Sequence, residues 1–217
     1  MHIPDGFVSP PVAATAFAVS AAAVALSSKA ASHRLEGKEV ALTGVTAAFI
    51  FAAQMLNFPV LAGTSGHFLG ATLAAVLLGP AMGILVMTLV VVVQCLGFAD
   101  GGLSALGANV LNMGVVGVLA GWLSWRVISG DGSSRARMLV GAAAGAWLSV
   151  VLASAACSTE LALSGTVPLV PSLAAMVTVH ALIGAGEAAI SVAALALLLT
   201  SRPDLVPGTR RAEGAAV

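Results

Sequence analysis

The sequence predicts an all-α membrane protein: a bundle of seven transmembrane helices, with the N-terminus outside the cell and the C-terminus in the cytoplasm. Of the 217 residues, 59% are hydrophobic and only 8% are charged, whereas about 25% of the residues of a soluble domain are charged. The chain cannot cover its surface with polar groups, so its surroundings must be lipid. Long uncharged segments and a one-sided distribution of basic residues then predict the number and orientation of the helices.

Uncharged segments define the predicted helices, because a bilayer crossing needs about 20 apolar residues. Four segments match one helix each: 6–28, 101–125, 138–159 and 171–200, the last interrupted only by Glu187. The segment 40–99 is long enough for two or three passes. Its Gly79-Pro80 pair is typical of a helix break. We therefore expect 67–78 to form a short or partly re-entrant helix of about 18 Å.

The basic residues orient the predicted bundle, because Lys and Arg accumulate in cytoplasmic loops. They follow the first helix, separate the fifth from the sixth, and close the chain: Lys29, Arg34, Lys38, Arg126, Arg135, Arg137, Arg202, Arg210 and Arg211. Seven crossings from an external N-terminus place all of them on the cytoplasmic side. A single continuous helix over 69–97 would place the central group outside, and we reject it.

We expect one transmembrane domain over residues 1–217, located in the cell (plasma) membrane. It would begin with an extracytoplasmic metal-chelating segment at 1–10 and end with a cytoplasmic tail at 202–217. No basic residue precedes Lys29, so the N-terminus lacks the basic region of a secretory signal peptide. We therefore expect the mature protein to keep Met1.

Charge and cysteine content bear on the partners of the chain. The formal net charge is zero, which gives no reason to expect a nucleic-acid partner. Cys95 and Cys157 are far apart and match no zinc-binding spacing. We interpret both as small apolar packing residues, with a disulfide as the minor alternative.

Polar side chains gather in the outer half of the predicted bundle. His2, His67 and His180 fall there, and only His33 lies in a cytoplasmic loop. All five side-chain amides map to the outer halves of the second, fourth and fifth helices: Gln54, Asn57, Gln94, Asn109 and Asn112. Polar groups in hydrocarbon are costly and usually face a bundle interior. We therefore expect a polar pocket open to the exterior, with helix–helix hydrogen bonding as the alternative.

The opening sequence MHIPDG offers three nitrogen donors to one cation. The Met1 amine, the His2 backbone nitrogen and the His2 imidazole Nδ1 would form fused five- and six-membered chelate rings. Such a square-planar nitrogen site selects Ni(II) or Cu(II), and low-spin Co(II) is chemically similar. His67, in the GTSGH motif, is the expected fourth ligand. A solvated terminus without function is the alternative for His2 considered alone.

Other polar residues have weaker assignments. Ser65 is expected either to hydrogen-bond near the metal or to cap a helix. Asp5 and Asp100 are exterior carboxylates, which we interpret as turn-forming residues rather than as attractors of cations. His180 and Glu187 share a helix face. The carboxylate of Glu187 lies mid-span and needs a polar partner or a proton, and we favour a structural network around the pocket over direct metal ligation.

Several long motifs occur in order along nearly the whole chain: MHIPDGF, AQMLNFPVLAGTSGHFLG, GFADGGLSALGANVLNMG and HALIGAGEA. Together they resemble the nickel/cobalt substrate-binding membrane subunit of energy-coupling-factor transporters. The resemblance implies that Met1, His2 and His67 hold the metal. It also implies a seven-span subunit that works with a transmembrane coupling protein and cytoplasmic ATPase subunits, a small accessory membrane subunit being a further candidate partner. Val8 and Phe68 stand where leucine is usual, which puts little in doubt.

The predicted function is capture of Ni(II) or Co(II) at an outward-facing site, followed by delivery for ATP-driven import. The bound metal is then the substrate, no catalytic cofactor is expected, and the chain is not an enzyme. The sequence contains no G-x-x-x-x-G-K-[ST] phosphate loop, so the energy must come from partner subunits. Nickel and cobalt are not distinguished, because both suit the same four nitrogens.

Two other functions are alternatives to metal capture. A rhomboid-like intramembrane serine protease would use Ser65, within a GTSG pattern, as nucleophile and His180 as base, but it leaves MHIPDG and His67 unexplained. A passive metal channel would need a ring of carboxylates or a carbonyl filter, and neither is visible in the sequence.

Overall fold

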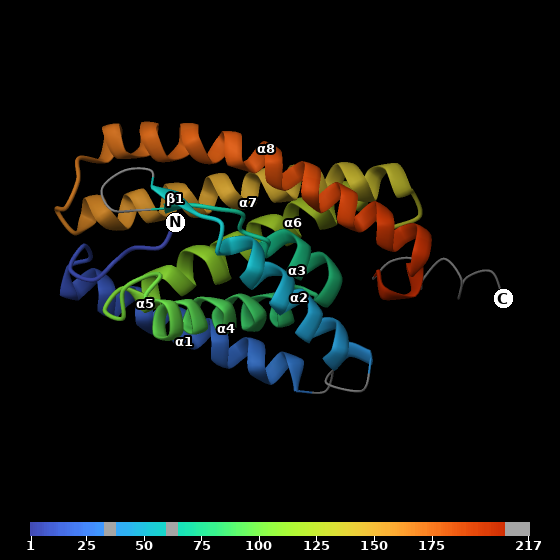
Figure 1. Cartoon of the computed structure of the whole chain (residues 1–217), viewed down its shortest axis with the longest axis horizontal. Coiled ribbons are helices and arrows are strands. Elements are labelled where there is room, and N and C mark those ends of the chain that lie inside the picture. The colour runs from blue at the N-terminus through green and yellow to red at the C-terminus, as the bar shows by residue number, and fades with distance from the viewer. Residues whose placement is uncertain (33–37, 60–64, 207–217) are drawn as a thin grey trace.

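The computed structural model describes residues 1–32, 38–59 and 65–206. Its helical elements are α1 (Pro10–Ala31), α2 (Lys38–Gln54), α3 (Ala71–Leu78), α4 (Pro80–Phe98), α5 (Leu106–Asn109), the π-helix η1 (Val110–Val116), α6 (Gly117–Ser129), α7 (Arg135–Leu163), α8 (Leu169–Ser201) and the 3-10 helix η2 (Pro203–Leu205). The long helices lie alongside one another and follow the length of the molecule (Figure 1). The predicted all-α architecture is therefore confirmed.

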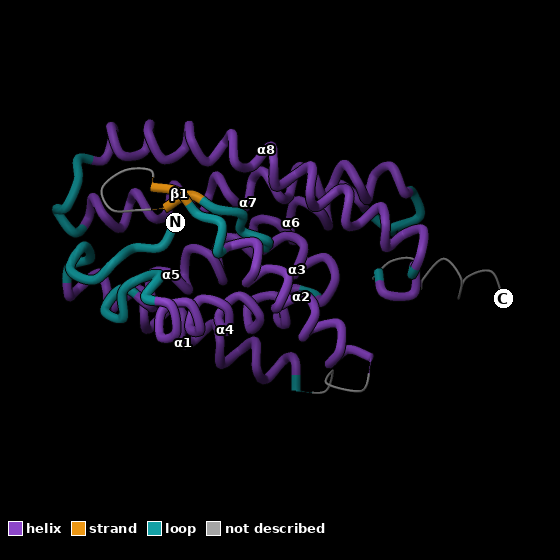
Figure 2. Tube along the Cα trace, viewed as in Figure 1, coloured by secondary structure: helices purple, strands orange, loops and turns teal. Residues whose placement is uncertain are grey.

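The only strands among the described residues are β1 (Phe58–Pro59) and β2 (Ser65–Gly66), which pair antiparallel. The sequence analysis did not predict this short ribbon. It lies beside the N-terminal segment, as Figure 2 shows. The pairing brings the chain from the end of α2 back toward the start of α3, and His67 follows β2 directly.

Proline and glycine set several helix ends. Pro10 and Pro80 open α1 and α4, because the fixed φ of proline suits the first turn of a helix. Gly79 has a φ of 82° and separates α3 from α4. The helix break predicted from Gly79-Pro80 is thus confirmed, and α3 is a separate helix of eight residues.

The predicted ends of the spans need correction. The first helix begins at Pro10, not at residue 6, because residues 1–9 are non-helical, with residues 1–3 buried in the bundle. The span predicted from residue 101 begins at Leu106 and runs through η1 to Ser129. The sixth predicted span is also longer than its uncharged stretch, because Arg135 and Glu160 both lie within α7.

Five helical segments are long and apolar enough to cross a membrane: α1, α4, the continuous 106–129 segment, α7 and α8. The chain is accordingly a multi-pass membrane protein. Helix α2 has 17 residues and α3 has eight, so both fall short of that length. Seven crossings, and the sides on which the termini lie, therefore stay predictions. Residues 207–217 of the predicted tail, and His33, lie outside the described residues.

Helix α3 lies at the centre of the bundle. Its residues from Ala71 to Leu77 are all buried. It packs against α6 and α7, where Gly121 and Gly145 leave room: a Cβ on Gly121 would overlap the Thr72 side chain of α3, and a Cβ on Gly145 would lie 3.2 Å from Thr72 Cγ2. Large apolar side chains instead cover the outer faces of the long helices, with Leu26 of α1 and Leu182 of α8 more than two-thirds exposed. Lipid is the solvent that suits such a surface.

Candidate metal centre

The N-terminal segment is folded into the bundle rather than exposed. Met1 and Ile3 are completely buried, and His2 is 3% exposed. Asn109 holds this segment as a neighbouring strand would: its Oδ1 accepts from the Ile3 N–H at 2.8 Å, and its Nδ2 donates to the Ile3 carbonyl at 3.0 Å. The Gly102 N–H donates to the same carbonyl at 2.8 Å. The first residues are therefore fixed by hydrogen bonds to the 101–109 region.

Two further contacts fix residues 5–7. The Asp5 carboxylate accepts from the backbone N–H and the hydroxyl of Ser104, at 2.7 and 2.6 Å. These hydrogen bonds lower the pKa of Asp5. The hydroxyl of Thr166 donates to the Phe7 carbonyl at 2.5 Å. The turn-forming role predicted for Asp5 thus becomes a specific contact between the N-terminal segment and the loop after α4.

His2 and His67 meet inside the bundle although they lie 65 positions apart in the sequence. Their imidazole rings are stacked, with centroids 4.8 Å apart and planes inclined by 19°. If both rings bound adjacent corners of one metal at about 2 Å, their centroids would lie about 4.5 Å apart. The two side chains are therefore close enough to share one cation.

The ring nitrogens of His2 face two polar side chains. Nε2 lies 3.1 Å from Gln94 Oε1, and Nδ1 lies 3.1 Å from Asp100 Oδ1. Asn57 donates to the other Asp100 oxygen at 3.0 Å. Burial lowers the pKa of His2, which favours the neutral imidazole. Although burial favours a protonated carboxyl, the contacts with His2 and Asn57 hold the pKa of Asp100 below its ordinary value.

The Met1 amine lies in the same buried region. Burial lowers the pKa of this amine from 8.0 to about 5, so the neutral amine, the form that binds metals, is favoured at neutral pH. Cys157 of α7 packs here, with its Sγ 3.9 Å from the Met1 carbonyl oxygen. Cys95 and Cys157 are both free thiols, so the alternative of a disulfide is not adopted.

His67 presents one ring nitrogen for ligation. Its Nδ1 lies 2.7 Å from the Phe68 carbonyl oxygen, and a carbonyl can only accept, so Nδ1 carries the proton. Burial lowers the pKa of His67 well below its ordinary value, so the ring is neutral and Nε2 keeps its lone pair. This Nε2 is buried and has no hydrogen-bond partner among the described residues. An unpartnered nitrogen of this kind fits a metal ligand.

Four of the five predicted pocket amides bond to the segments that carry these groups. Gln94 contacts His2, Asn57 contacts Asp100, and Asn109 contacts Ile3, as given above. Gln54 donates to the Leu69 carbonyl at 2.6 Å, just beyond His67. Asn112 differs, because its Nδ2 donates to Glu160 Oε2 at 2.6 Å within the bundle.

The remaining predicted residues lie as follows. His180 is buried on α8, with its Nδ1 2.8 Å from the Met176 carbonyl oxygen. The Ser65 side chain lies outside the described part of the structure, so its two predicted roles stay predictions. Among the described residues, no three carboxylate, thiol or imidazole side chains converge.

Sequence reasoning missed the contacts of two carboxylates. It interpreted Asp100 as a turn residue, whereas the structure places it against His2. It left Glu187 without a named partner, whereas its oxygens accept from the N–H groups of Leu69 and Gly70. The topology placed Asp100 on the same side of the bundle as His2, and this shared depth was the signal that could have linked them.

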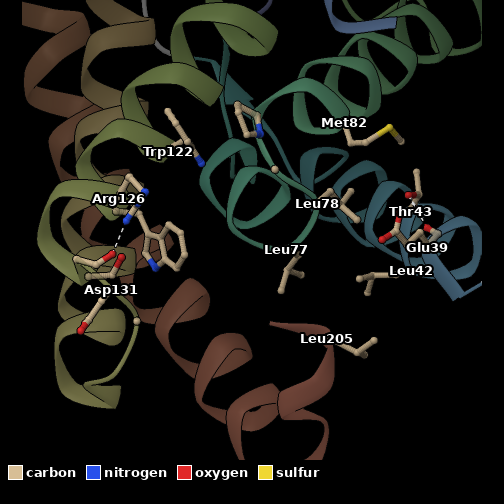
Figure 3. Close-up of a pocket in the computed structure, with 16 residues that line it drawn as sticks. Glu39, Leu42, Thr43, Leu77, Leu78, Met82, Trp122, Arg126, Asp131 and Leu205 are labelled. Atoms are coloured by element: carbon tan, nitrogen blue, oxygen red, sulfur yellow. Dashed lines mark hydrogen bonds between the residues drawn. The ribbon is translucent and has the colours of Figure 1, made fainter. Parts of the chain in front are cut away.

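A separate cavity of about 550 Å³ lies at the other end of α3 (Figure 3). Glu39 of α2, Leu77 of α3, and Trp122 and Arg126 of α6 are among the residues that line it. Its described lining contains no histidine, cysteine or amide side chain. It therefore lacks the ligands of the cluster around His2.

The fold and these contacts define a class: a multi-pass helical membrane protein with a buried, nitrogen-rich candidate metal site. Comparison with known families identifies the class of protein more closely. The family of the cobalt uptake substrate-specific transmembrane region (CbiM) matches residues 2–205, and the chain belongs to that family. This agrees with the resemblance seen in the motifs, and the family is one of transport rather than catalysis. Nothing in it supports the protease alternative.

Individual relatives carry related names. The fused nickel transport protein NikMN of Rhodobacter capsulatus is 33% identical over 230 residues, covering 99% of this chain and 66% of that protein. The cobalt transport protein CbiM of Geobacter sulfurreducens is 35% identical over 221 residues, covering 95% of this chain and 61% of that protein. A crystal structure of a transition metal transporter is similar in fold, with a TM-score of 0.84, 30% identity and 92% of each chain covered. The chain is thus a member of a family of substrate-specific transmembrane components of cobalt uptake, and its relatives carry the names of nickel as well as cobalt transport proteins.

Proposed function

We propose that this chain captures Ni(II) or Co(II) at the outer side of the membrane and presents it to an energy-coupling-factor transporter. The observation that carries the proposal is the convergence of the Met1 amine, His2 and His67 in one buried cluster, at 4.8 Å between the imidazole centroids. The family supports a cobalt or nickel substrate. Both metals suit a site of four nitrogens, so the proposal covers both.

Each ligand has a defined chemical task. The Met1 amine is neutral and binds without first losing a proton. The His2 backbone nitrogen binds after the metal displaces its amide proton, and Nδ1 of the same residue completes the second chelate ring. His67 contributes Nε2. When His2 donates its Nε2–H to Gln94, Nδ1 keeps the lone pair that the metal requires.

Asp100 would balance the charge of the bound metal. A divalent cation with one deprotonated amide leaves a net charge of +1 in a buried site, where unbalanced charge is costly. The Asp100 carboxylate lies 3.1 Å from His2 Nδ1 and supplies the opposite charge. The metal then replaces the Asp100 contact at Nδ1, while the carboxylate stays close enough to balance the complex.

The N-terminal segment serves as both ligand and cover. Met1, His2 and His67 are each 3% exposed or less, so an ion held among them is shielded from water. Delivery to the cytoplasm requires this arrangement to be broken. A transmembrane coupling subunit and cytoplasmic ATPase subunits are the proposed partners for that step, because the chain has no phosphate-binding loop of its own. A small accessory membrane subunit is a further proposed partner.

Metal analysis of the purified protein tests the proposal. The protein should be produced with a C-terminal affinity tag, its N-terminal mass verified, and nickel or cobalt supplied in turn. We expect one metal ion per chain by mass spectrometry of the metals. A variant with one alanine added before Met1 should lose this metal, because the amine is displaced from the chelate. The matched control carries the same alanine after Val217. Stoichiometric metal in the N-terminally extended protein would exclude the amine as a ligand.

A further inference from the structure

Glu187 is a buried carboxylate in the middle of α8, with 1% exposure. Both of its oxygens are engaged by the chain just after His67. Oε2 accepts from the Leu69 N–H at 2.6 Å, and Oε1 accepts from the Gly70 N–H at 2.8 Å. The contact joins residues 118 positions apart. It brings a carboxylate of α8 to the start of α3, next to the loop that carries His67.

The Leu69 N–H and the Phe68 carbonyl are the two ends of one planar peptide group. That carbonyl oxygen lies 2.7 Å from His67 Nδ1. A continuous chain of hydrogen bonds therefore runs from Glu187 Oε2 through the Phe68–Leu69 peptide group to the His67 ring. The peptide accepts a hydrogen bond from His67 at one end and donates one to Glu187 at the other.

We propose that Glu187 is a positioning residue for His67, acting through this single peptide group. The inference rests on the proposed function, because it treats His67 Nε2 as a metal ligand. Metal-binding histidines usually donate their other ring N–H to a carboxylate or a carbonyl, which fixes the tautomer and raises the basicity of the ligand. Here His67 donates to a carbonyl, and the N–H of the same peptide group donates to a carboxylate. The carboxylate polarises the peptide, and the polarised carbonyl becomes a better acceptor for His67 Nδ1–H.

The local backbone explains why the acceptor comes from a distant helix. The N-terminus of α3 has no side-chain cap of its own, and the preceding residue is Gly70 at a φ of 76°. A Cβ there would lie 2.8 Å from Ile50 Cγ1, so a larger capping residue does not fit. Gln54 of α2 holds the next peptide group through the Leu69 carbonyl. The His67 loop is thus pinned from α8 on one side and from α2 on the other.

The tautomer of His67 in the metal-free wild-type protein is the first test. Nitrogen NMR of histidine-labelled protein in lipid separates protonated from unprotonated ring nitrogens, and a His67→Ala spectrum assigns the signal. We expect the Nδ1–H form alone. The Nε2–H form in the wild-type protein would overturn the proposal, and this measurement depends on no variant at residue 187.

The second test compares Glu187→Gln with Glu160→Gln. Glu160 is also a buried carboxylate within a long apolar helix, but it bonds to Asn112 rather than to the His67 loop. Loss of an outer partner of a metal ligand costs about 10–100-fold in metal affinity. We expect a Ni(II) affinity loss in that range for Glu187→Gln, with a mixed His67 tautomer, and neither change for Glu160→Gln.

The possible outcomes separate the two proposals. Equal losses in both variants, or an unchanged affinity in Glu187→Gln, would overturn the role of Glu187. A changed affinity with an unchanged His67 tautomer would also overturn it, because a residue that only caps α3 would produce that result. If the wild-type protein bound neither Ni(II) nor Co(II), the proposed function would fail instead, while the tautomer measurement would still report on the hydrogen-bond chain.

Discussion

The buried Met1 amine is expected to make the stability of the metal-free protein depend on pH between about pH 5 and pH 8. Burial lowers the pKa of this amine from 8.0 in the unfolded chain to about 5 in the folded one. Above pH 8 both states are neutral, and the folded state has its full stability. As the pH falls from 8 toward 5, the unfolded chain binds a proton that the folded protein does not, so the free energy of unfolding falls.

The size of the effect follows from the two pKa values. A difference of about three pH units, at 1.36 kcal/mol per unit, corresponds to about 4 kcal/mol between pH 8 and pH 5. Below about pH 6.5 the two buried histidines act in the same direction, because burial lowers the pKa of His2 and of His67 as well. Between pH 6.5 and 8 the amine alone would contribute a slope of up to about 1.4 kcal/mol per pH unit, to which the other buried ionisable groups add their own contributions.

Unfolding of the metal-free protein in detergent, followed by circular dichroism across this window, measures the slope. The control is the same protein with its amine acetylated, which removes this titrating group and keeps all the others. The difference between the two profiles therefore measures the amine. Parallel profiles for the two proteins would refute a buried, neutral amine. A difference of the opposite sign would show that the amine binds its proton more tightly when folded.

Three further predictions concern His67, the anchoring of the N-terminal segment by Asn109, and the orientation of the chain in the membrane. His67→Ala should lose tightly bound nickel or cobalt in metal analysis while keeping its helical circular dichroism, and stoichiometric metal in that variant would exclude His67 as a required ligand. Asn109→Ala leaves the buried Ile3 N–H unpaired, which costs about 1–3 kcal/mol, so metal should dissociate faster in chelator-chase experiments; an unchanged rate would argue against Asn109 as the anchor of the segment. In a background without native cysteines, cysteine at Ser133 should react only with reagents in the cytoplasm and cysteine at Ser164 only from outside, and reversed labelling would contradict the predicted orientation.

Local sequence signals predicted much of the architecture because they act over a few residues. The Gly79-Pro80 pair predicted the break after α3, since proline lacks the N–H that a continuous helix needs. The same reasoning misjudged α7, where Arg135 and Glu160 lie within the helix. Uncharged stretches mark the apolar core of a span, but a helix extends into the polar boundary, so charge alone sets only its minimum length.

The parts of the site that depend on adjacent residues could be predicted from the sequence, whereas the contacts between residues far apart in the chain could not. The three nitrogen donors of Met1 and His2 belong to two adjacent residues, so their ability to chelate a metal could be predicted. Their proximity to His67 was expected from the predicted depth of both histidines in the membrane and from the family resemblance. The partners of Asp100 and Glu187 were not, because neither spacing nor periodicity relates Glu187 to Leu69 across 118 positions. Such a contact depends on how α8 packs beside the start of α3, which only the folded chain specifies.

The way in which the proposed ligands are anchored predicts which of them would move during metal exchange. His67 lies in a loop that Glu187 and Gln54 hold by three hydrogen bonds, and the buried helix α3 follows it. Displacing this loop would unpair buried backbone groups and disturb the centre of the bundle. The first residues are held by hydrogen bonds of Ile3 with Asn109 and Gly102 and of Asp5 with Ser104, and they belong to no helix. Moving this segment would break these hydrogen bonds and expose Met1 and Ile3, but it would displace no helix directly, whereas moving the His67 loop would displace the start of α3. If Met1, His2 and His67 hold the metal as proposed, we therefore expect exchange to begin with release of the Met1 and His2 nitrogens, while His67 keeps its place in the bundle.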